Sequence, residues 1–347
     1  MKVAIVAFNN IRISPYVKTY SNWLEEKGID YDLIYLNRSG EQEQLGSCTY
    51  SIPFNPKRGK FMNFLRFGKE VKKILTKNKY GFVFVMPTFP AVILSSFLKK
   101  KYKGKYVVDI RDRTYEDNKF YFKREKCAVE NSAMNVISSK GYTSFLPEAK
   151  YVFCPNISAS SRTPKYKFKR REGGVISIAY VGCIARVGLY KRLIEKVLSD
   201  GRFAVDLYGS EVTPGAISEY VKELGSDRVR YHGAFKPEEK AEIVKSVDIL
   251  INIYGTLGMK RAMANKLYDA MYFKKPLISE ADSLMYEECE GHSFAFDIED
   301  ERVLDKLYDW YMNIDGEAFD KFADDYIERT YAELDEFYAE LERAVLG

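Results

Sequence analysis

The sequence has little of the material from which hydrolytic and metal-dependent sites are built. It contains two histidines, His232 and His292, and no HExxH motif. A His-based metal site or a Ser-His-Asp hydrolase is therefore disfavoured, and we expect no metal ligands; His232 is expected to be structural or to lie beside a ligand. The five cysteines lie far apart and form no CxxC pair, which disfavours a disulfide framework and indicates a reducing cytoplasm.

Signatures of cofactor binding and membrane insertion are also missing. No GxGxxG follows the first predicted strand and no GxxxxGK[ST] occurs, which disfavours a dinucleotide site of the usual kind and a P-loop NTPase. No apolar run reaches the ~18–20 residues of a membrane span, and the opening MKVAIVAFNN is too short for a signal-peptide core. We expect a cytoplasmic protein without a cofactor.

What is present is a repeated strand-helix pattern over 347 residues, enough for two α/β domains of ~150–170 residues each. The predicted strands are Lys2–Phe8, Tyr31–Leu36, Gly81–Met86, Tyr106–Ile110, Val136–Ser138, Ser177–Val181, Phe203–Tyr208, Arg228–His232, Ile249–Ile253 and Pro276–Ser279. The predicted helices are Pro15–Lys27, Phe61–Lys79, Ala91–Leu98, Leu189–Ser199, Gly215–Leu224, Pro237–Ser246, Ala264–Phe273 and, as one helix or a helix pair, Phe319–Val345. This order predicts two mostly parallel sheets with helices on both faces.

Composition divides the chain. We expect a first domain over 1–160, a linker over 161–174, a second domain over 175–317 and a C-terminal helical segment over 318–347; the stretch from Pro155 to Gly174 has a linker's composition. The helix predicted over Phe61–Lys79 is expected to direct five apolar side chains toward a core, namely Phe64, Leu65, Val71, Ile74 and Leu75.

The two halves differ in charge. Residues 1–160 hold 27 Lys and Arg against 14 Asp and Glu, a net +13, whereas residues 161–347 hold 27 against 35, a net −8. A basic half suits an anionic partner, such as a phospholipid surface or a lipid-diphosphate acceptor. Solvated Lys-rich helix faces explain the same excess, and the sequence leaves both interpretations open.

Three predicted strands of the second half end at glycine, namely at Gly182, Gly209 and Gly233. Ligands of open parallel sheets bind beyond the carboxyl ends of strands, and glycine there lets backbone N–H groups approach a phosphate, although close helix–sheet packing explains it too. Arg186 and Lys191 follow the first of these strands. Both are predicted to contact an anion such as a diphosphate, whose charge grows as a sugar leaves.

Lys266 and Asp269 are three residues apart in NKLYDAMYFKKPLIS and share one face of a predicted helix. A lysine there can hold phosphate oxygens while the carboxylate accepts two ribose hydroxyls. The alternative interpretation is a surface ion pair worth ~0–1 kcal/mol.

The order of these pieces resembles the GT-B glycosyltransferases, in particular the family-4-like sugar transferases of bacterial polysaccharide and capsule assembly. The resemblance spans nearly the whole chain through VVDIRDR, ISSKGYTSFLP, a PN pair before the linker, IAYVGCIAR, LYGSE, VRYHGAFKPEEKAEIVKSVDILIN and NKLYDAMYFKKPLIS. It implies two Rossmann-like parallel-sheet domains facing a cleft, with the donor on the second. It also implies that the helix over 318–347 packs back on the first domain.

Carried over residue by residue, the resemblance implies diphosphate contacts for Arg186 and Lys191 and a ribose contact for Asp269, with Lys266 beside it. Further substrate contacts are predicted at Gly182, Gly209, Gly233, Tyr254, Gly255, Thr256, Asn265 and Arg111. One position departs from the pattern: Arg261 stands where many members have a Glu that contacts the donor sugar. In VVDIRDR, Asp112 is a candidate base near the acceptor, whereas Asp109 is expected to be structural.

The resemblance thus implies a retaining, metal-independent hexosyltransferase. It would use a UDP- or GDP-type nucleotide-diphosphate sugar and a glycan or lipid-diphosphate-linked acceptor, and it would bind no nucleic acid. The basic half would contact the inner membrane face. Three rivals remain open: a nucleotide-sugar epimerase, a catalytically inactive protein that binds sugar nucleotides or polysaccharide, and a peripheral membrane scaffold.

Overall fold

The computed structural model describes residues 1–157, 162–255 and 257–347, so the predicted contact Thr256 lies outside the described residues. The chain divides into two compact units. Unit 1 comprises Met1–Pro155 together with Glu333–Gly347, and unit 2 comprises Asn156–Ala332.

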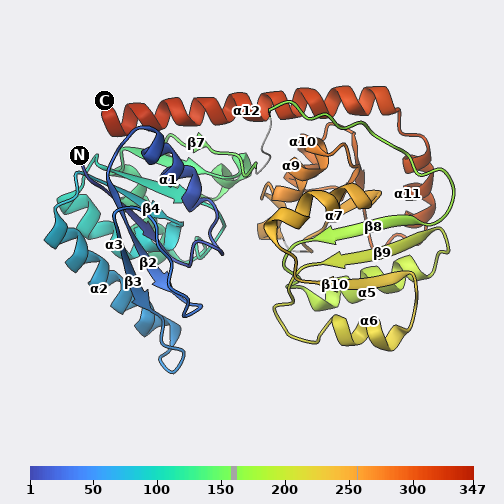
Figure 1. Ribbon diagram of the computed structural model, residues 1–347, viewed down its shortest axis with the longest axis horizontal. Coiled ribbons are helices and arrows are strands. Elements are labelled where there is room, and N and C mark those ends of the chain that lie inside the picture. The colour runs from blue at the N-terminus through green and yellow to red at the C-terminus, as the bar shows by residue number, and fades with distance from the viewer. Residues whose placement is uncertain (158–161, 256) are drawn as a thin grey trace. The chain divides into compact units, whose positions relative to one another are not determined.

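Unit 1 contains a parallel sheet of seven strands in the order β3-β2-β1-β4-β5-β6-β7 (Figure 1). The strands are β1 (Val3–Ala7), β2 (Tyr31–Asn37), β3 (Cys48–Pro53), β4 (Phe82–Met86), β5 (Tyr106–Ile110), β6 (Met134–Ile137) and β7 (Val152–Phe153). In the central pairs, Val3 lies opposite both Tyr31 and Phe82. Every residue of β1, VAIVA, is buried, because this strand is covered on both faces.

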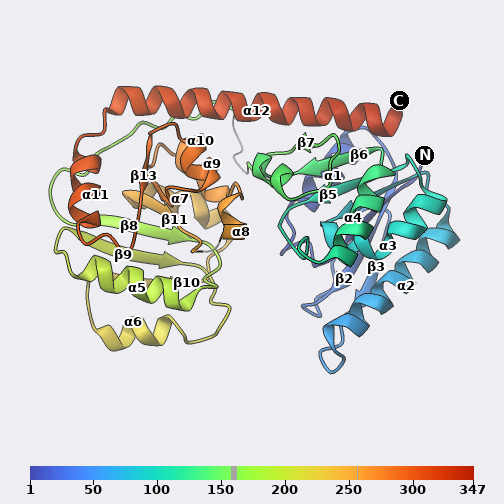
Figure 2. The same ribbon diagram turned by 180° about the vertical axis from the view of Figure 1, so that it is seen from behind.

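Helices cover both faces of this sheet. They are α1 (Val17–Glu26), α2 (Lys60–Asn78), α3 (Thr88–Lys101) and α4 (Lys119–Glu130), followed by a 3-10 turn over Lys140–Ser144. Figure 2 shows α2, α3 and α4 side by side. One hydrophobic core joins β1 and α1 to the last turns of the C-terminal helix, where the Phe337 ring packs edge-on against Tyr20 at 5.8 Å.

The structure departs from the sequence prediction in unit 1 at several places. Leu65 was expected in the core, and this is wrong: the side chain is 49% exposed on α2, next to the exposed Phe61 and Met62. Strand β3 was not predicted, because it lies at the sheet edge and is largely half-buried. Helix α4 was not predicted either, since its pattern, KFYFKREKCAVE, is dense in charge.

Unit 2 contains a parallel sheet of six strands in the order β10-β9-β8-β11-β12-β13. The strands are β8 (Ile176–Val181), β9 (Phe203–Tyr208), β10 (Val229–Gly233), β11 (Ile249–Asn252), β12 (Leu277–Ser279) and β13 (Ser293–Ala295). In both units, successive strands run outward on one side of the first strand and then continue on its other side. The strand order therefore reverses between β1 and β4 in unit 1 and between β8 and β11 in unit 2. Such a reversal creates a crevice at the carboxyl ends of the strands.

The helices of unit 2 surround its sheet (Figures 1 and 2). They are α5 (Val187–Leu198), α6 (Ser218–Leu224), a 3-10 turn (Pro237–Glu239), α7 (Lys240–Ser246), α8 (Leu257–Lys260), α9 (Asn265–Tyr272), α10 (Leu284–Glu288) and α11 (Val303–Met312). The described stretch 162–175 forms neither helix nor strand. It is anchored on unit 2 by Phe168, whose ring contacts Tyr311 and Phe319.

The C-terminal segment is one helix, α12 (Gly316–Leu346), rather than a pair. Its residues up to Ala332 belong to unit 2 and those from Glu333 onward to unit 1. Within the part of the chain that the structure describes, no helix combines the length and the apolar character needed to cross a membrane.

Candidate functional site

The three predicted strand-end glycines lie together at the carboxyl edge of the unit 2 sheet. The N–H of Gly182 donates to the Tyr208 carbonyl at 2.8 Å, and the N–H of Gly209 donates to the Gly233 carbonyl at 2.7 Å. Gly209 has a φ of +135°, and a Cβ there would overlap the carbonyl of Gly182. The close approach of these strand ends therefore requires glycine, so packing accounts for at least part of the pattern.

Lys266 reaches the same edge from α9. A Cβ added to Gly182 would lie 3.2 Å from the Lys266 ammonium nitrogen, so the missing side chain makes room for this cation. The ammonium lies 4.1 Å from the centroid of the Tyr180 ring, a favourable cation–π contact. A positive charge is thus placed at the carboxyl end of β8, as an anion site at this edge would need.

Asp269 is paired with a residue that the sequence did not indicate. Its carboxylate accepts from the Lys240 ammonium at 2.7 and 2.9 Å, whereas Lys266 interacts with it only at longer range. Burial raises the pKa of Asp269, and the Lys240 charge opposes this shift. The alternative interpretation, an ion pair between Lys266 and Asp269, therefore gives way to a link between α9 and α7, and the ribose contact of Asp269 stays a prediction. Asn265 is exposed at the first position of α9.

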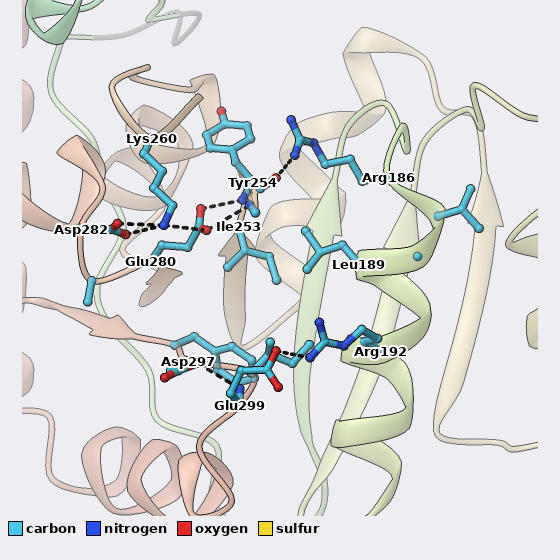
Figure 3. A pocket seen from close by; sticks show the side chains of 16 residues that line it. Arg186, Leu189, Arg192, Ile253, Tyr254, Lys260, Glu280, Asp282, Asp297 and Glu299 are labelled. Atoms are coloured by element: carbon cyan, nitrogen blue, oxygen red, sulfur yellow. Dashed lines mark hydrogen bonds and ion pairs between the residues drawn. The ribbon is translucent and has the colours of Figure 1, made fainter. Parts of the chain in front are cut away.

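A cavity of about 780 Å³ opens beside the reversal of strand order in unit 2 (Figure 3). This volume falls within the ~300–1,000 Å³ usual for small-molecule sites. Its walls come from the segments after β8, β11, β12 and β13. The charged lining residues are Arg186, Arg192, Lys260, Glu280, Asp282, Asp297 and Glu299.

One wall of this cavity is the loop after β11. Arg186, at the start of α5, donates to the carbonyl of Tyr254. Glu280 accepts from the backbone N–H groups of Tyr254 and Gly255, as Figure 3 shows. The structure therefore brings together three predicted contact residues, Arg186, Tyr254 and Gly255. The backbone N–H groups of Tyr254 and Gly255 are bonded to the Glu280 carboxylate.

Sequence reasoning missed Glu280 and Lys260. The Lys260 ammonium lies 2.7 Å from Asp282 and 3.6 Å from Glu280. For Glu280 a signal was available, since it directly follows the predicted strand Pro276–Ser279 and so stands at a carboxyl end. With Arg192 paired to Glu299, the lining holds three cations and four carboxylates. An entering anion would have to compete with those carboxylates.

Lys191 lies apart from this cavity. Its ammonium is 4.4 Å from the centroid of the Tyr220 ring on α6, and Lys191 does not line the cavity. Lys191 and Arg186 therefore have different surroundings, although Lys191 is on α5 and Arg186 immediately precedes it. A diphosphate contact for Lys191 stays a prediction.

His232 has structural partners. Its Nε2 lies 2.8 Å from the Asp206 carboxylate, and its ring stacks on Tyr208 with the centroids 4.0 Å apart. Asp206 also accepts two hydrogen bonds from Arg230, both of 2.7 Å. These contacts tie β9 to the edge strand β10.

Unit 1 has a second cavity, of about 250 Å³, at the carboxyl ends of its strands. It is lined by Phe8, Arg38, Phe54, Lys60, Phe64, Pro87, Phe89, Asp112, Thr114 and Tyr115. Asp112 lines this cavity, and part of its surface is exposed. Burial raises the pKa of Asp112 to about 6, against the lowering effect of Arg111. A carboxylate with this pKa is suited to accept a proton near neutral pH.

Arg111 is 6% exposed and points into the unit instead. Its guanidinium contacts the buried carboxylate of Asp109 at 2.6 and 2.7 Å, and the same carboxylate accepts from Tyr20 at 2.8 Å. Asp109 is structural, as expected. The substrate contact that we predicted for Arg111 stays a prediction, and its burial weighs against it.

No family model and no curated protein sequence matches the chain. Among solved structures, sucrose-phosphate synthase from Thermosynechococcus elongatus has a TM-score of 0.73 at 13% identity, covering 100% of this chain and 99% of that one. The lipopolysaccharide outer core galactosyltransferase WaaB has a TM-score of 0.64 at 15% identity, with 100% and 99% covered.

A third similar structure contains a nucleotide. HepE from Anabaena, in complex with UDP and glucose, has a TM-score of 0.68 at 10% identity, covering 99% of this chain and 100% of that one. At these identities the likeness establishes the fold: the chain has the GT-B glycosyltransferase architecture of two parallel α/β sheets, of seven and six strands.

Proposed function

We propose that the chain is a glycosyltransferase that moves a hexose from a nucleotide-diphosphate sugar to a glycan or lipid-linked acceptor. The observation that carries this proposal is the placement of two cations at the carboxyl edge of the unit 2 sheet. Arg186 begins α5 beside the reversal of strand order, and Lys266 lies against Gly182. Open parallel sheets bind nucleotides at this position. The UDP in the HepE complex supports a UDP- or GDP-type donor.

In this proposal, the chain's own cations stabilise the departing diphosphate. Charge accumulates on the diphosphate as the sugar leaves, and Arg186, Lys191 and Lys266 neutralise it in the role that a divalent metal has in other transferases. Asp269 accepts from the ribose hydroxyls. Transfer is retaining, and the proton of the acceptor hydroxyl passes to the leaving diphosphate or to Asp112.

The biological setting follows from the same proposal. The enzyme works in the cytoplasm, in the assembly of a polysaccharide such as a capsule, with the basic unit 1 near the inner membrane face. All five cysteines are free thiols, as a reducing compartment would keep them.

A thermal-shift screen tests the donor. UDP, GDP, ADP and CDP are compared at saturating concentration, with inorganic diphosphate as the control for charge alone. A ligand at about 100 times its dissociation constant adds ~2.7 kcal/mol to the stability of the folded state. UDP or GDP is expected to raise the melting temperature beyond the effect of diphosphate, and no shift with any nucleotide would contradict the proposal.

One observation favours a second candidate, a protein that binds sugar nucleotides without turnover. Arg261 replaces the expected Glu, and its guanidinium lies 2.9 Å from the Glu287 carboxylate. Incubation of the purified protein with UDP- and GDP-sugars separates the candidates. Release of the nucleoside diphosphate supports the enzyme, whereas binding without release supports the second candidate.

A further inference from the structure

An apolar groove lies on unit 1 between α2, α3 and α4. Its volume is about 900 Å³. The lining residues are Lys60, Phe61, Phe64, Leu65, Gly68, Lys69, Lys72, Phe89, Val92, Ile93, Tyr115, Asn118, Phe120, Tyr121 and Arg124. Four of them are cationic and none is acidic. The groove therefore combines an apolar wall with a basic rim.

The apolar wall reaches the protein surface. Phe61 is 70% exposed, Leu65 49% and Phe120 71%, although all three are large apolar side chains. Phe61 and Leu65 are four residues apart on α2 and so lie on one face of the helix. A cluster of exposed apolar side chains marks a binding surface, whereas single exposed apolar side chains occur on most proteins.

This groove adjoins the smaller cavity that contains Asp112. The two share four lining residues: Lys60, Phe64, Phe89 and Tyr115. The rings of Phe64 and Phe89, with centroids 4.8 Å apart, form part of the common wall. The cavity at the carboxyl ends of the unit 1 strands and the groove between the helices are therefore adjacent.

The smaller cavity contains cations suited to a phosphate. The Arg38 guanidinium lies over the Phe8 ring, 4.9 Å from its centroid, and 5.8 Å from the centroids of Phe54 and Phe64. Among residues 1–157, 162–255 and 257–347, no carboxylate forms an ion pair with Arg38 or with Lys60. A guanidinium held on aromatic faces keeps its N–H groups available for a phosphate.

We propose that the acceptor is an anionic lipid, a phosphate or diphosphate ester of a long hydrocarbon chain. Arg38 and Lys60 bind the phosphate, the chain lies in the groove between α2 and α4, and the sugar-accepting end reaches Asp112. This inference rests on the proposed function and selects the lipid-linked acceptor over the free glycan. A free glycan would leave the apolar wall in water, whereas a hydrocarbon chain covers it.

Direct binding tests the inference without donor or turnover. The probe is dodecyl phosphate below its micelle-forming concentration, and the comparison probe is a neutral tetraethylene glycol ether with the same chain. Phe120→Ser and Leu65→Ser change exposed groove side chains. Val212→Ser is the matched control, because Val212 is 60% exposed on unit 2. Arg38→Gln tests the phosphate contact, and Lys73→Gln is its control, because Lys73 is an exposed cation on α2 that does not line the groove.

We expect the groove variants to weaken both amphiphiles by about tenfold, and Arg38→Gln to weaken only dodecyl phosphate by a similar factor, with the controls unaltered. Failure of the full-length protein to bind dodecyl phosphate, or equal binding by all variants, overturns the inference. So does a result in which the groove variants lose only binding to phosphatidylglycerol vesicles while single amphiphiles never bind. That result would identify a membrane-docking face instead.

The same variants keep this inference distinct from the proposed function. The groove variants and Arg38→Gln are expected to retain the thermal shift given by the nucleoside diphosphate, since these changes lie in unit 1. A protein that binds dodecyl phosphate but no nucleotide would refute the donor site and leave the lipid groove standing. A protein that binds nucleotide but no amphiphile would refute the lipid groove and leave the donor site standing.

Discussion

The carboxylate of Glu280 accepts a hydrogen bond from the backbone N–H of Tyr254 at 2.7 Å. Its other oxygen accepts from the N–H of Gly255 at 3.0 Å, and the Lys260 ammonium lies 3.6 Å away. Successive N–H groups beside a cation form a small anion-binding concavity. In this structure the protein's own carboxylate fills it.

Neutralising Glu280 should therefore strengthen nucleotide binding. Glu280→Gln removes a negative charge beside the proposed diphosphate position and loosens the hold on two backbone donors. We expect UDP or GDP to bind about threefold to tenfold more tightly by calorimetry. The exposed Glu301→Gln, outside the cavity, serves as control. Equal or weaker binding by the Glu280 variant would show that this carboxylate positions the loop rather than competing with the ligand.

Loss of Arg186 should weaken nucleoside diphosphates. Its guanidinium is placed at the start of α5, where a diphosphate would gain charge-assisted hydrogen bonds, so Arg186→Ala should cost about tenfold or more in affinity. Lys191→Ala is expected to act in the same direction. Arg192→Ala removes a cation of the same cavity that is paired with Glu299, and it should have little effect. Unaltered affinity for both UDP and GDP in the Arg186 and Lys191 variants would contradict the proposed diphosphate contacts.

Asp112 predicts a pH dependence of transfer. Burial raises the pKa of Asp112 to about 6, and only the ionised carboxylate accepts a proton. If Asp112 is the base, kcat/KM rises with pH through about 6, and Asp112→Asn removes this limb of the profile and lowers the plateau by about 10²-fold or more. An unchanged profile in the variant would assign the proton to the leaving diphosphate.

Glu125 predicts a pH dependence of stability. The side chain is fully buried in α4, and burial, followed by the charge of Glu116, raises the pKa of Glu125 from 4.5 to about 8. Between these values the unfolded chain releases the proton and the folded protein keeps it, so stability falls as pH rises across this window. Glu125→Gln should therefore stabilise the protein near pH 8, by on the order of 2 kcal/mol, and much less near pH 5.

Thermal unfolding at the two pH values checks this prediction. Glu130→Gln is the matched control, because Glu130 is exposed on the same helix. A stabilisation of equal size at both pH values would show that Glu125 is ionised in the folded protein or that the effect comes from packing.

The fold was predictable because the strands are short, apolar and regularly separated by amphipathic helices. SIAYV and VDLY, for instance, correspond to β8 and β9 within one or two residues. Exposed elements gave weaker signals. Leu65 has the spacing of a core residue on α2, and its exposure follows from which helices pack alongside, which spacing does not specify.

The candidate site was only partly predictable. Glycines and cations at strand ends are local features, so the sequence indicated Gly182, Arg186 and Lys266, whose contacts with a ligand stay predictions. The partners of these residues depend on contacts between distant segments. Lys240 pairs with Asp269 across 29 residues, and Glu280 holds the loop at Tyr254 across 26. No local sequence pattern specifies these contacts.

Helix α12 also has a consequence for how the protein is made. Its last turns contribute Phe337 and Leu341, both fully buried, to the core of unit 1. Domains usually fold in the order in which the ribosome delivers them, N-terminal first. Here the unit that emerges first lacks part of its core until residues 333–347 are synthesised, so unit 2 has all of its own residues before unit 1 does. Removal of residues 333–347 would therefore damage unit 1.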